Sequence, residues 1–179
     1  MKTVFNIHNA FKQSQLEISS NTSYDLLYEY LVPYKKDMLP EDVFFEVATG
    51  KKSYDLIRLF QSGEFFFSQR FIDVLAHHVD MSDKCYPIKI KGIEEQYYVI
   101  YNIEESSYLN KEKSMFDEEP PFYCKNNIRN PLFAISNTRH FVVTDKLKNE
   151  IINNKLTNIE FTESFLCTRE EYKEWRKSH

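Results

Sequence analysis

The side chain types most often used for catalysis and metal binding are present in this chain, but they are dispersed. The only adjacent histidines are His77 and His78, in a segment with helical spacing. Neighbouring helical side chains point about 100° apart, so this pair cannot share one metal ion as residues four apart would. Asp73 lies four residues before His77, but no third ligand accompanies the two. We therefore interpret all three as surface or packing residues and predict neither a metal site nor a cofactor.

The three cysteines are the next candidates, because a thiolate beside a base can act as a nucleophile. The sequence has no CxxC motif, and none of Cys85, Cys124 and Cys167 has a histidine nearby in sequence. We expect free, largely buried thiols in a reducing cytosol. One enzymatic alternative stays open: a dispersed site in which Cys85 or Cys124 meets His77 or His140, or one built from carboxylates.

Two hydroxyl residues stand out because each follows an apolar run and precedes a helical pattern. They are Ser68 and Thr144. This is the N-cap position of a helix, where a Ser or Thr side chain accepts a backbone hydrogen bond, so we interpret both as caps. Glycine, which phosphate-cradling loops require, occurs only three times. We predict no catalytic residue and conclude that the chain is not an enzyme.

Composition limits the class of protein. The chain has 179 residues, of which 42% are hydrophobic, with 15 Phe and 12 Tyr; this is enough to build the core of one domain. The net charge of −4 lacks the basic footprint of a nucleic-acid binder. No apolar run approaches the roughly 18 residues of a membrane span, and the N-terminus lacks the apolar core of a signal peptide. We predict a cytoplasmic protein without nucleic-acid or membrane partners.

The elements that position these residues include an internal repeat. Residues 56–75 and 132–151 match without a gap, with identities at Leu56/Leu132 and Phe65/Phe141. Each copy is an apolar run, then a hydroxyl residue, then apolar residues four apart, which is typical of a strand followed by a helix. We predict one α+β domain over residues 1–179, with a mainly antiparallel sheet and the helices of the duplicated unit packed on it. The sequence leaves open whether the two repeat strands pair parallel or antiparallel.

The rest of the chain supplies further elements. Apolar alternation, capping residues and turn residues define them. We expect strands at 4–8, 43–47 and 158–162, a hairpin of 86–90 with 96–103, helices at 23–31 and 169–177, and a surface loop over 104–121.

This loop is the segment with the most unusual composition. It is rich in acids interleaved with aromatics and ends in Pro120 and Pro121. Such a surface can anchor a protein partner. We predict partner contact at Glu104, Glu105, Tyr108, Phe116, Asp117, Glu118 and Glu119, where the acidic charge would suit a basic partner.

Over roughly residues 55–165 the chain resembles an immunity-protein family of bacterial polymorphic toxin systems, first named after a myxobacterial member. The matching pieces are FFFSQRF at 65–71, YYVIYNI at 97–103, PLF at 131–133, FVVTDKL at 141–147 and LTNIEF at 156–161. Where the family has a glycine before its last strand, this chain has Asn158. The loop after the first helix, 80–84, is also longer.

The resemblance implies a non-enzymatic antidote that binds and blocks a cognate toxin. It transfers no functional residue, because the matching motifs are structural. Two other classes stay open: the enzyme with a dispersed site, and a structural protein that self-associates through its aromatic residues. The sequence does not set the oligomeric state.

Overall fold

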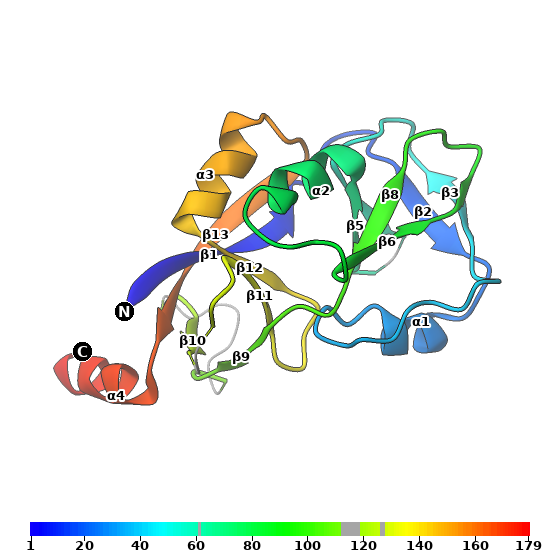
Figure 1. Ribbon diagram of the computed structural model, residues 1–179. Coiled ribbons are helices and arrows are strands. Elements are labelled where there is room, and N and C mark those ends of the chain that lie inside the picture. The colour runs from blue at the N-terminus through cyan, green and yellow to red at the C-terminus, as the bar shows by residue number, and fades with distance from the viewer. Residues whose placement is uncertain (61, 112–118, 126–127) are drawn as a thin grey trace.

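The computed structural model describes residues 1–60, 62–111, 119–125 and 128–179. The fold is α+β, with helices and two mainly antiparallel sheets side by side (Figure 1). The helices are α1 (Tyr24–Tyr30), α2 (Gln69–Ala76), α3 (Asp145–Asn153) and α4 (Arg169–Ser178). The strands are β1 (Lys2–Asn9), β2 (Glu17–Ser20), β3 (Phe45–Thr49), β4 (Leu56–Leu59), β5 (Phe65–Ser68), β6 (Cys85–Ile88), β7 (Ile90–Lys91), β8 (Tyr97–Ile100), β9 (Glu105–Tyr108), β10 (Phe122–Cys124), β11 (Leu132–Ile135), β12 (Phe141–Thr144) and β13 (Ile159–Cys167).

The two sheets have the same construction. One sheet, which we call the first sheet, has the strand order β6-β8-β5-β4-β2-β3-β7. The other, which we call the second sheet, is a closed barrel in the order β1-β12-β11-β9-β10-β13. The edge strands of the first sheet, β6 and β7, are consecutive in the chain and are separated only by Lys89. The carbonyl of Lys89 accepts a hydrogen bond from Phe45 N of β3 at 2.8 Å. The first sheet therefore curls until its edges meet along one interrupted strand.

The internal repeat is the origin of this likeness. In the first copy Leu56 pairs with Phe67, and 76 residues further along Leu132 pairs with Val143 in the same antiparallel register. Each copy is therefore a hairpin followed by a helix, where the sequence analysis expected one strand and a helix. The predicted strand–helix unit is confirmed, and the apolar run before it adds a further strand.

The likeness extends beyond the repeat found in the sequence. β4 pairs in parallel with β2, and β11 pairs in parallel with β9. β2 pairs antiparallel with β3, and β9 pairs antiparallel with β10. On its other side β3 pairs in parallel with β7, and β10 pairs in parallel with the end of β13. The first sheet and the second sheet thus correspond strand by strand, with β13 matching β6 and β7 together.

The two copies exchange one strand, the strand that pairs with β5 in the first sheet and with β12 in the second. β5 pairs antiparallel with β8, and β12 pairs antiparallel with β1. β1 therefore fills in the second sheet the position that β8 fills in the first. In chain order, one copy of the duplicated unit runs from β1 to β7 and the other from β8 to β13. The first strand of each copy pairs in the sheet of the other copy: β1 lies in the second sheet and β8 in the first.

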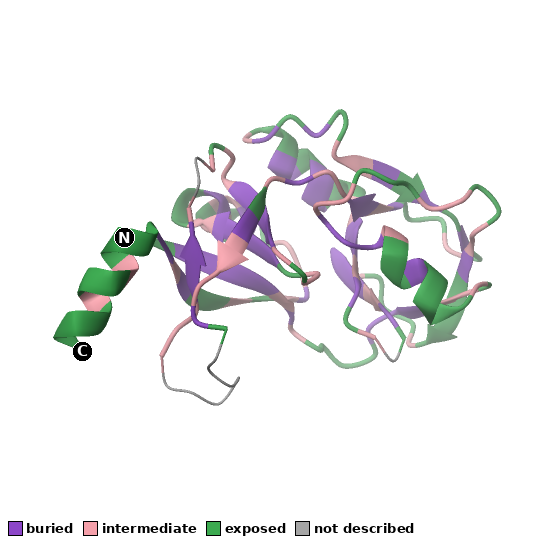
Figure 2. Ribbon diagram, turned by 90° about the horizontal axis from the view of Figure 1, so that it is seen from below, coloured by how far each residue is buried: buried purple, intermediate pink, exposed green. Residues whose placement is uncertain are grey.

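Three hydrophobic clusters hold the fold together. The largest lies between the sheets, where α2 and α3 meet and equivalent residues of both copies, such as Phe71 and Leu147, pack into one core. The interior of the first sheet is a second cluster that includes Phe45, Phe66 and Val99. The interior of the second sheet is smaller and includes Phe133. The burial of both interiors is visible in Figure 2.

The structure answers the question of how the repeat strands pair. β5 and β12 belong to different sheets and do not pair with each other. The predicted surface loop over 104–121 is wrong at its start, because β9 forms there between β10 and β11. The predicted hairpin is confirmed by the pairing of β6 with β8.

The predicted helix starts differ in outcome. Ser68 caps α2 by accepting from Phe71 N at 3.1 Å, as expected. Thr144 is the N-cap residue of α3, as predicted, but its side chain does not make the expected capping hydrogen bond. The C-terminal helix α4 begins with a capping box formed by Thr168 and Glu171. It is exposed along most of its length (Figure 2) and packs through Trp175 on Phe122 of β10.

Candidate binding surfaces

The residues predicted to contact a partner are not gathered into one exposed patch. Glu104 faces inward to the turn before β11: its carboxylate accepts from Arg129 N at 3.0 Å and from Asn130 N at 3.3 Å. Tyr108 is half-buried, with its ring 5.6 Å from that of Tyr123. Both residues therefore have a structural role in the second sheet.

The remaining members of the predicted cluster differ in exposure. Glu105 lies on β9 and is exposed, whereas Glu119 is half-buried. Phe116, Asp117 and Glu118 lie outside the described residues. Among the predicted contact residues that the structure describes, Glu105 is thus the most available to a partner.

A second surface with acids and aromatics lies at the equivalent place in the first sheet. The connection from β9 to β10 holds the acidic segment, and the corresponding connection from β2 to β3 holds α1. Leu27 is the only buried residue of this helix, while Tyr24, Leu26 and Tyr28 are 45%, 43% and 45% exposed. Tyr24 and Tyr28 are one helical turn apart with ring centroids separated by 6.5 Å, whereas Leu26 lies on the opposite side of the helix. We call the two tyrosines, together with Arg139, the α1 surface.

Arg139 contacts both α1 and the turn between β4 and β5. It lies in the turn between β11 and β12, with its guanidinium 3.8 Å from the ring centroid of Tyr28 and Nη1 donating to Tyr24 Oη at 2.7 Å. Its ion-pair partner is Glu64, at the end of the turn between β4 and β5, and Tyr24 Oη also donates to that carboxylate at 3.0 Å. The α1 surface is therefore supported from both copies, which fixes the orientation of its aromatic rings.

Two grooves occupy equivalent positions in the two copies, beside the start of α2 and the start of α3. The first groove has a volume of about 360 Å³ and the second about 420 Å³. Each is lined by the residues before β4 or β11, by the first turn of the helix, and by the start of β8 or β1. In the first groove these are Ser53, Tyr54, Asp55, Ser68, Gln69, Arg70, Glu95, Gln96 and Tyr97, which correspond in order to Arg129, Asn130, Pro131, Thr144, Asp145, Lys146, Lys2, Thr3 and Val4 in the second.

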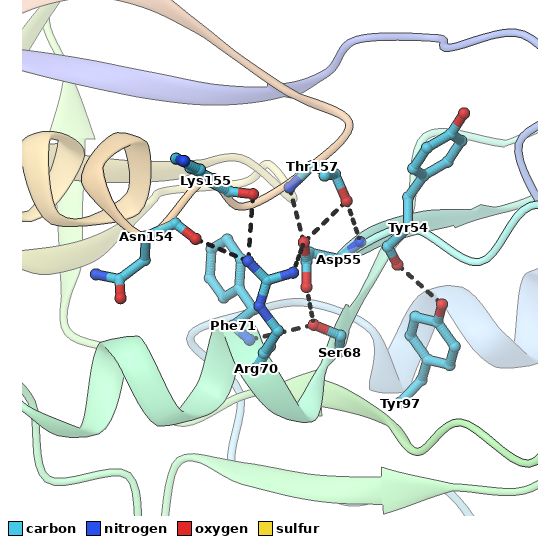
Figure 3. A network of polar contacts seen from close by, with 9 residues as sticks. All are labelled: Tyr54, Asp55, Ser68, Arg70, Phe71, Tyr97, Asn154, Lys155 and Thr157. Carbon is cyan, nitrogen blue, oxygen red and sulfur yellow. Dashed lines mark hydrogen bonds and ion pairs between the residues drawn. The ribbon is translucent and has the colours of Figure 1, made fainter.

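The first groove contains its own anion, the buried carboxylate of Asp55 (Figure 3). Asp55 Oδ1 accepts from Ser68 Oγ at 2.7 Å. Its Oδ2 accepts from Thr157 N and from Thr157 Oγ1, both at 2.8 Å, and lies 3.4 Å from Nη1 of Arg70. Every oxygen of this carboxylate is thus satisfied within the chain.

Arg70 extends this network to the other copy. Its Nη2 donates to the carbonyl of Asn154 at 2.7 Å and to that of Lys155 at 3.2 Å, just beyond α3 (Figure 3). The start of α2 is thereby bonded to the end of α3. The network of Asp55 and Arg70 is a structural link between the copies.

The second groove has the opposite electrostatic character. Pro131 takes the place of Asp55, so this groove has no internal carboxylate at that position. Its cations are Lys2, Lys125, Arg129 and Lys146, and its only acid is Asp145. Across the described ranges, none of these four cationic side chains forms an ion pair. The groove therefore presents an excess of unpaired positive charge.

No family model matches this chain, and no curated protein matches it.

Two of the cysteines have a raised pKa, and one of them, Cys85, belongs to the enzymatic alternative. Cys85 Sγ donates to the carbonyl of Met81 at 3.5 Å, and burial raises the pKa of its thiol. Burial likewise raises the pKa of Cys167 to about 11. A nucleophilic cysteine needs a lowered pKa, so these two thiols are protonated at neutral pH. None of the three cysteines forms a disulfide with another described residue.

Metal-binding groups and membrane-spanning helices were the other features considered in the sequence. Across the residues that the structure describes, no group of three or more His, Cys, Asp or Glu side chains is placed to hold a metal ion. No described helix is both long enough and apolar enough to cross a membrane.

Sequence reasoning missed both grooves and the α1 surface. The signal for the grooves was present in the repeat itself, since the 76-residue offset aligns Asp55 with Pro131 and Arg70 with Lys146. The signal for α1 was a helix with five apolar or aromatic residues among seven, more than one buried face requires.

Proposed function

We propose that this chain is an immunity protein that binds a cognate bacterial toxin and neutralises it without chemistry of its own. The α1 surface is the main contact in this proposal. Tyr and Arg dominate the binding energy of protein interfaces, and here two exposed tyrosines are grouped around the guanidinium of Arg139 and held in place before any partner binds. This grouping is the observation that carries the proposal.

The sequence resemblance also supports it. The matching pieces at 65–71, 97–103 and 141–147 fall on β5 and α2, on β8, and on β12 and α3, whose residues build the core between the sheets. Asn158, where the family has glycine, has a φ of +65°. Glycine and asparagine are the residues that tolerate this left-handed conformation best, so the exchange is accounted for by the backbone.

The charge around α1 indicates the kind of toxin surface that would fit. Asp25 and Glu29 are exposed on the same helix as Tyr24 and Tyr28. Acidic groups at the rim of an aromatic contact favour a partner with a basic surface and speed the encounter. This agrees with the basic partner expected from the acidic segment, where Glu105 is exposed.

The test is co-expression with the toxin domain encoded beside the gene of this chain. The wild-type protein should restore growth and co-purify with the toxin domain. The variant Tyr24→Ala/Tyr28→Ala should bind at least about tenfold more weakly, because two anchoring rings are lost. Glu105→Lys should have a smaller effect, visible mainly in the association rate.

The matched control is Ile152→Ala, which removes an exposed apolar side chain of α3, 51% accessible, far from the α1 surface. It should bind the toxin domain as the wild type does. Failure of the wild-type protein to bind and to protect would overturn the proposed function. Equal affinity of the wild type and the tyrosine variant, both folded, would remove α1 as the contact.

A further inference from the structure

The two grooves differ in one way that points to a ligand: the first has a buried carboxylate between its hydroxyl and its cation, and the second has none at the equivalent position. In the first groove the hydroxyl of Ser68 and the guanidinium of Arg70 both bind the carboxylate of Asp55. The equivalent residues of the second groove are Thr144 and Lys146, which are again a hydroxyl and a cation. Pro131 stands where Asp55 would be, and a proline side chain cannot accept their hydrogen bonds.

The second groove has added cations rather than lost them. Glu95 and Ser53 of the first groove correspond to Lys2 and Arg129, and Lys125 lies alongside. The protein as a whole carries a net charge of −4, so four cations around one cavity with a single acid are not a reflection of the general surface. Unpaired like charges held together repel each other unless an anion lies between them.

The backbone adds to this field. Because the side chain of Thr144 makes no capping hydrogen bond, the first turn of α3 lacks the side-chain acceptor that Ser68 provides for α2. The first N–H groups of a helix point toward its N-terminal end and favour a negative group there.

We propose that the second groove is a binding site for the phosphate group of a small phosphorylated molecule. A phosphate ester carries a charge of about −1.5 to −2 at neutral pH and three acceptor oxygens, which suit the hydroxyl of Thr144 and the amines of Lys2 and Lys146. The groove also has apolar walls at Ile128 and Leu166, which can hold the uncharged part of the ligand. Its volume of about 420 Å³ is within the range of small-molecule sites.

This site is separate from the α1 surface and does not depend on the proposed toxin binding. The probes are inorganic phosphate and phenyl phosphate, with phenylacetate as a carboxylate of similar size, each titrated into the full chain by calorimetry. Phenyl phosphate should bind most tightly, inorganic phosphate less tightly, and phenylacetate at least about tenfold more weakly than phenyl phosphate because it carries only one negative charge.

Two variants locate the binding. Arg129→Gln/Lys146→Gln removes two cations and should weaken phenyl phosphate binding at least about tenfold. Pro131→Asp places a carboxylate where the first copy has Asp55, and this internal anion should compete with the ligand and reduce binding to a similar degree. Lys36→Gln, an exposed lysine outside the groove, is the control and should bind as the wild type does.

Thermal unfolding of each variant without ligand shows whether it is folded. If the folded wild type does not bind phenyl phosphate at concentrations up to about 10 mM, the proposal is wrong. The same conclusion follows if Pro131→Asp and the double variant, both folded, bind it as tightly as the wild type.

Discussion

The interiors of the two sheets differ at equivalent positions. In the first sheet Val99, Ile88 and Phe45 face inward and belong to one apolar cluster. In the second sheet the corresponding residues are Asn6, Ser164 and Tyr123, and they form a buried hydrogen-bonded group: Asn6 Nδ2 donates to Ser164 Oγ at 2.7 Å and Tyr123 Oη donates to Asn6 Oδ1 at 2.9 Å.

At the grooves, the buried polar network lies in the first copy instead of the second. The first copy, with the apolar interior, carries the buried polar network of Asp55 at its groove, whereas the second copy leaves its groove open and cationic. The same backbone thus supports either arrangement. The comparison teaches that the fold depends on the shared core between the sheets, while the interiors and the grooves have been free to diverge.

The largest expected effect comes from removing the anion of the first groove. Asp55→Ala leaves the partly buried amide and hydroxyl of Thr157 and the hydroxyl of Ser68 without their acceptor. The loss of this whole network should lower the free energy of unfolding by about 3 kcal/mol. Arg70 is more than half exposed and can be rehydrated, so its ion pair adds little to this figure.

Urea denaturation measures this loss, and Pro131→Ala at the equivalent position is the control. That substitution removes no hydrogen bond and should cost less than about 1 kcal/mol. Similar losses for the two variants would contradict the view that only the first copy relies on an internal anion.

The second prediction compares the buried tyrosines of the two sheets at high pH. Burial raises the pKa of Tyr97 in the first sheet and of Tyr123 in the second to about 12. The unfolded chain has the ordinary tyrosine pKa of about 10, so the folded state holds these protons more tightly. The stability that each tyrosine contributes is complete below about pH 10 and is lost as the pH rises from there to about 12, by roughly 2 kcal/mol.

Stability should therefore fall more steeply above pH 10 in the wild type than in Tyr97→Phe or Tyr123→Phe. Denaturant unfolding at a series of alkaline pH values measures the slopes. Absorbance at the tyrosinate band, followed in the folded protein, should show these groups ionising after the exposed tyrosines. An unchanged slope in either variant would mean that the tyrosine concerned is not the source of the alkaline loss.

The smallest effect concerns the polar interior of the second sheet. Asn6→Val introduces the residue of the first sheet but leaves Ser164 and Tyr123 without their common partner, and should cost about 1.5 kcal/mol. The triple variant Asn6→Val/Ser164→Ile/Tyr123→Phe copies the whole apolar set and should recover most of that loss, since replacing all partners together orphans none.

Thermal or urea unfolding of the single and triple variants gives both values. If the triple variant is less stable than the single one, the interiors are not interchangeable and their packing has diverged along with their chemistry.

Local pattern was sufficient to predict much of the fold. The repeat at 56–75 and 132–151, the hairpin after α2 and the capped C-terminal helix were all visible in apolar spacing and cap residues. The wider duplication was not visible, because the connections between equivalent strands differ in length and the inward residues differ in polarity. β9 was missed for a related reason: its four residues are paired on both sides but carry no apolar alternation.

The candidate surfaces depend on contacts that are distant in sequence. Ser68 and Thr144 have the same local pattern, and they differ in capping although nothing beside them predicts it. Glu104 was interpreted as a partner contact, but it binds the backbone at 129–130, more than twenty residues away. A side chain whose partner is supplied only by the folded chain cannot be assigned from spacing.

The exchanged strand has a consequence for the order in which the protein can be built. All strands of the first sheet lie between residues 17 and 100, so this half can close while the ribosome is still making the second. β1, however, pairs along its whole length with β13, which is made about 150 residues later. At translation rates of about 5–20 residues per second, β1 waits for roughly 8–30 s with its apolar side chains unpaired. We expect chaperones to bind β1 in nascent chains, since its partner strand β13 is synthesised so much later.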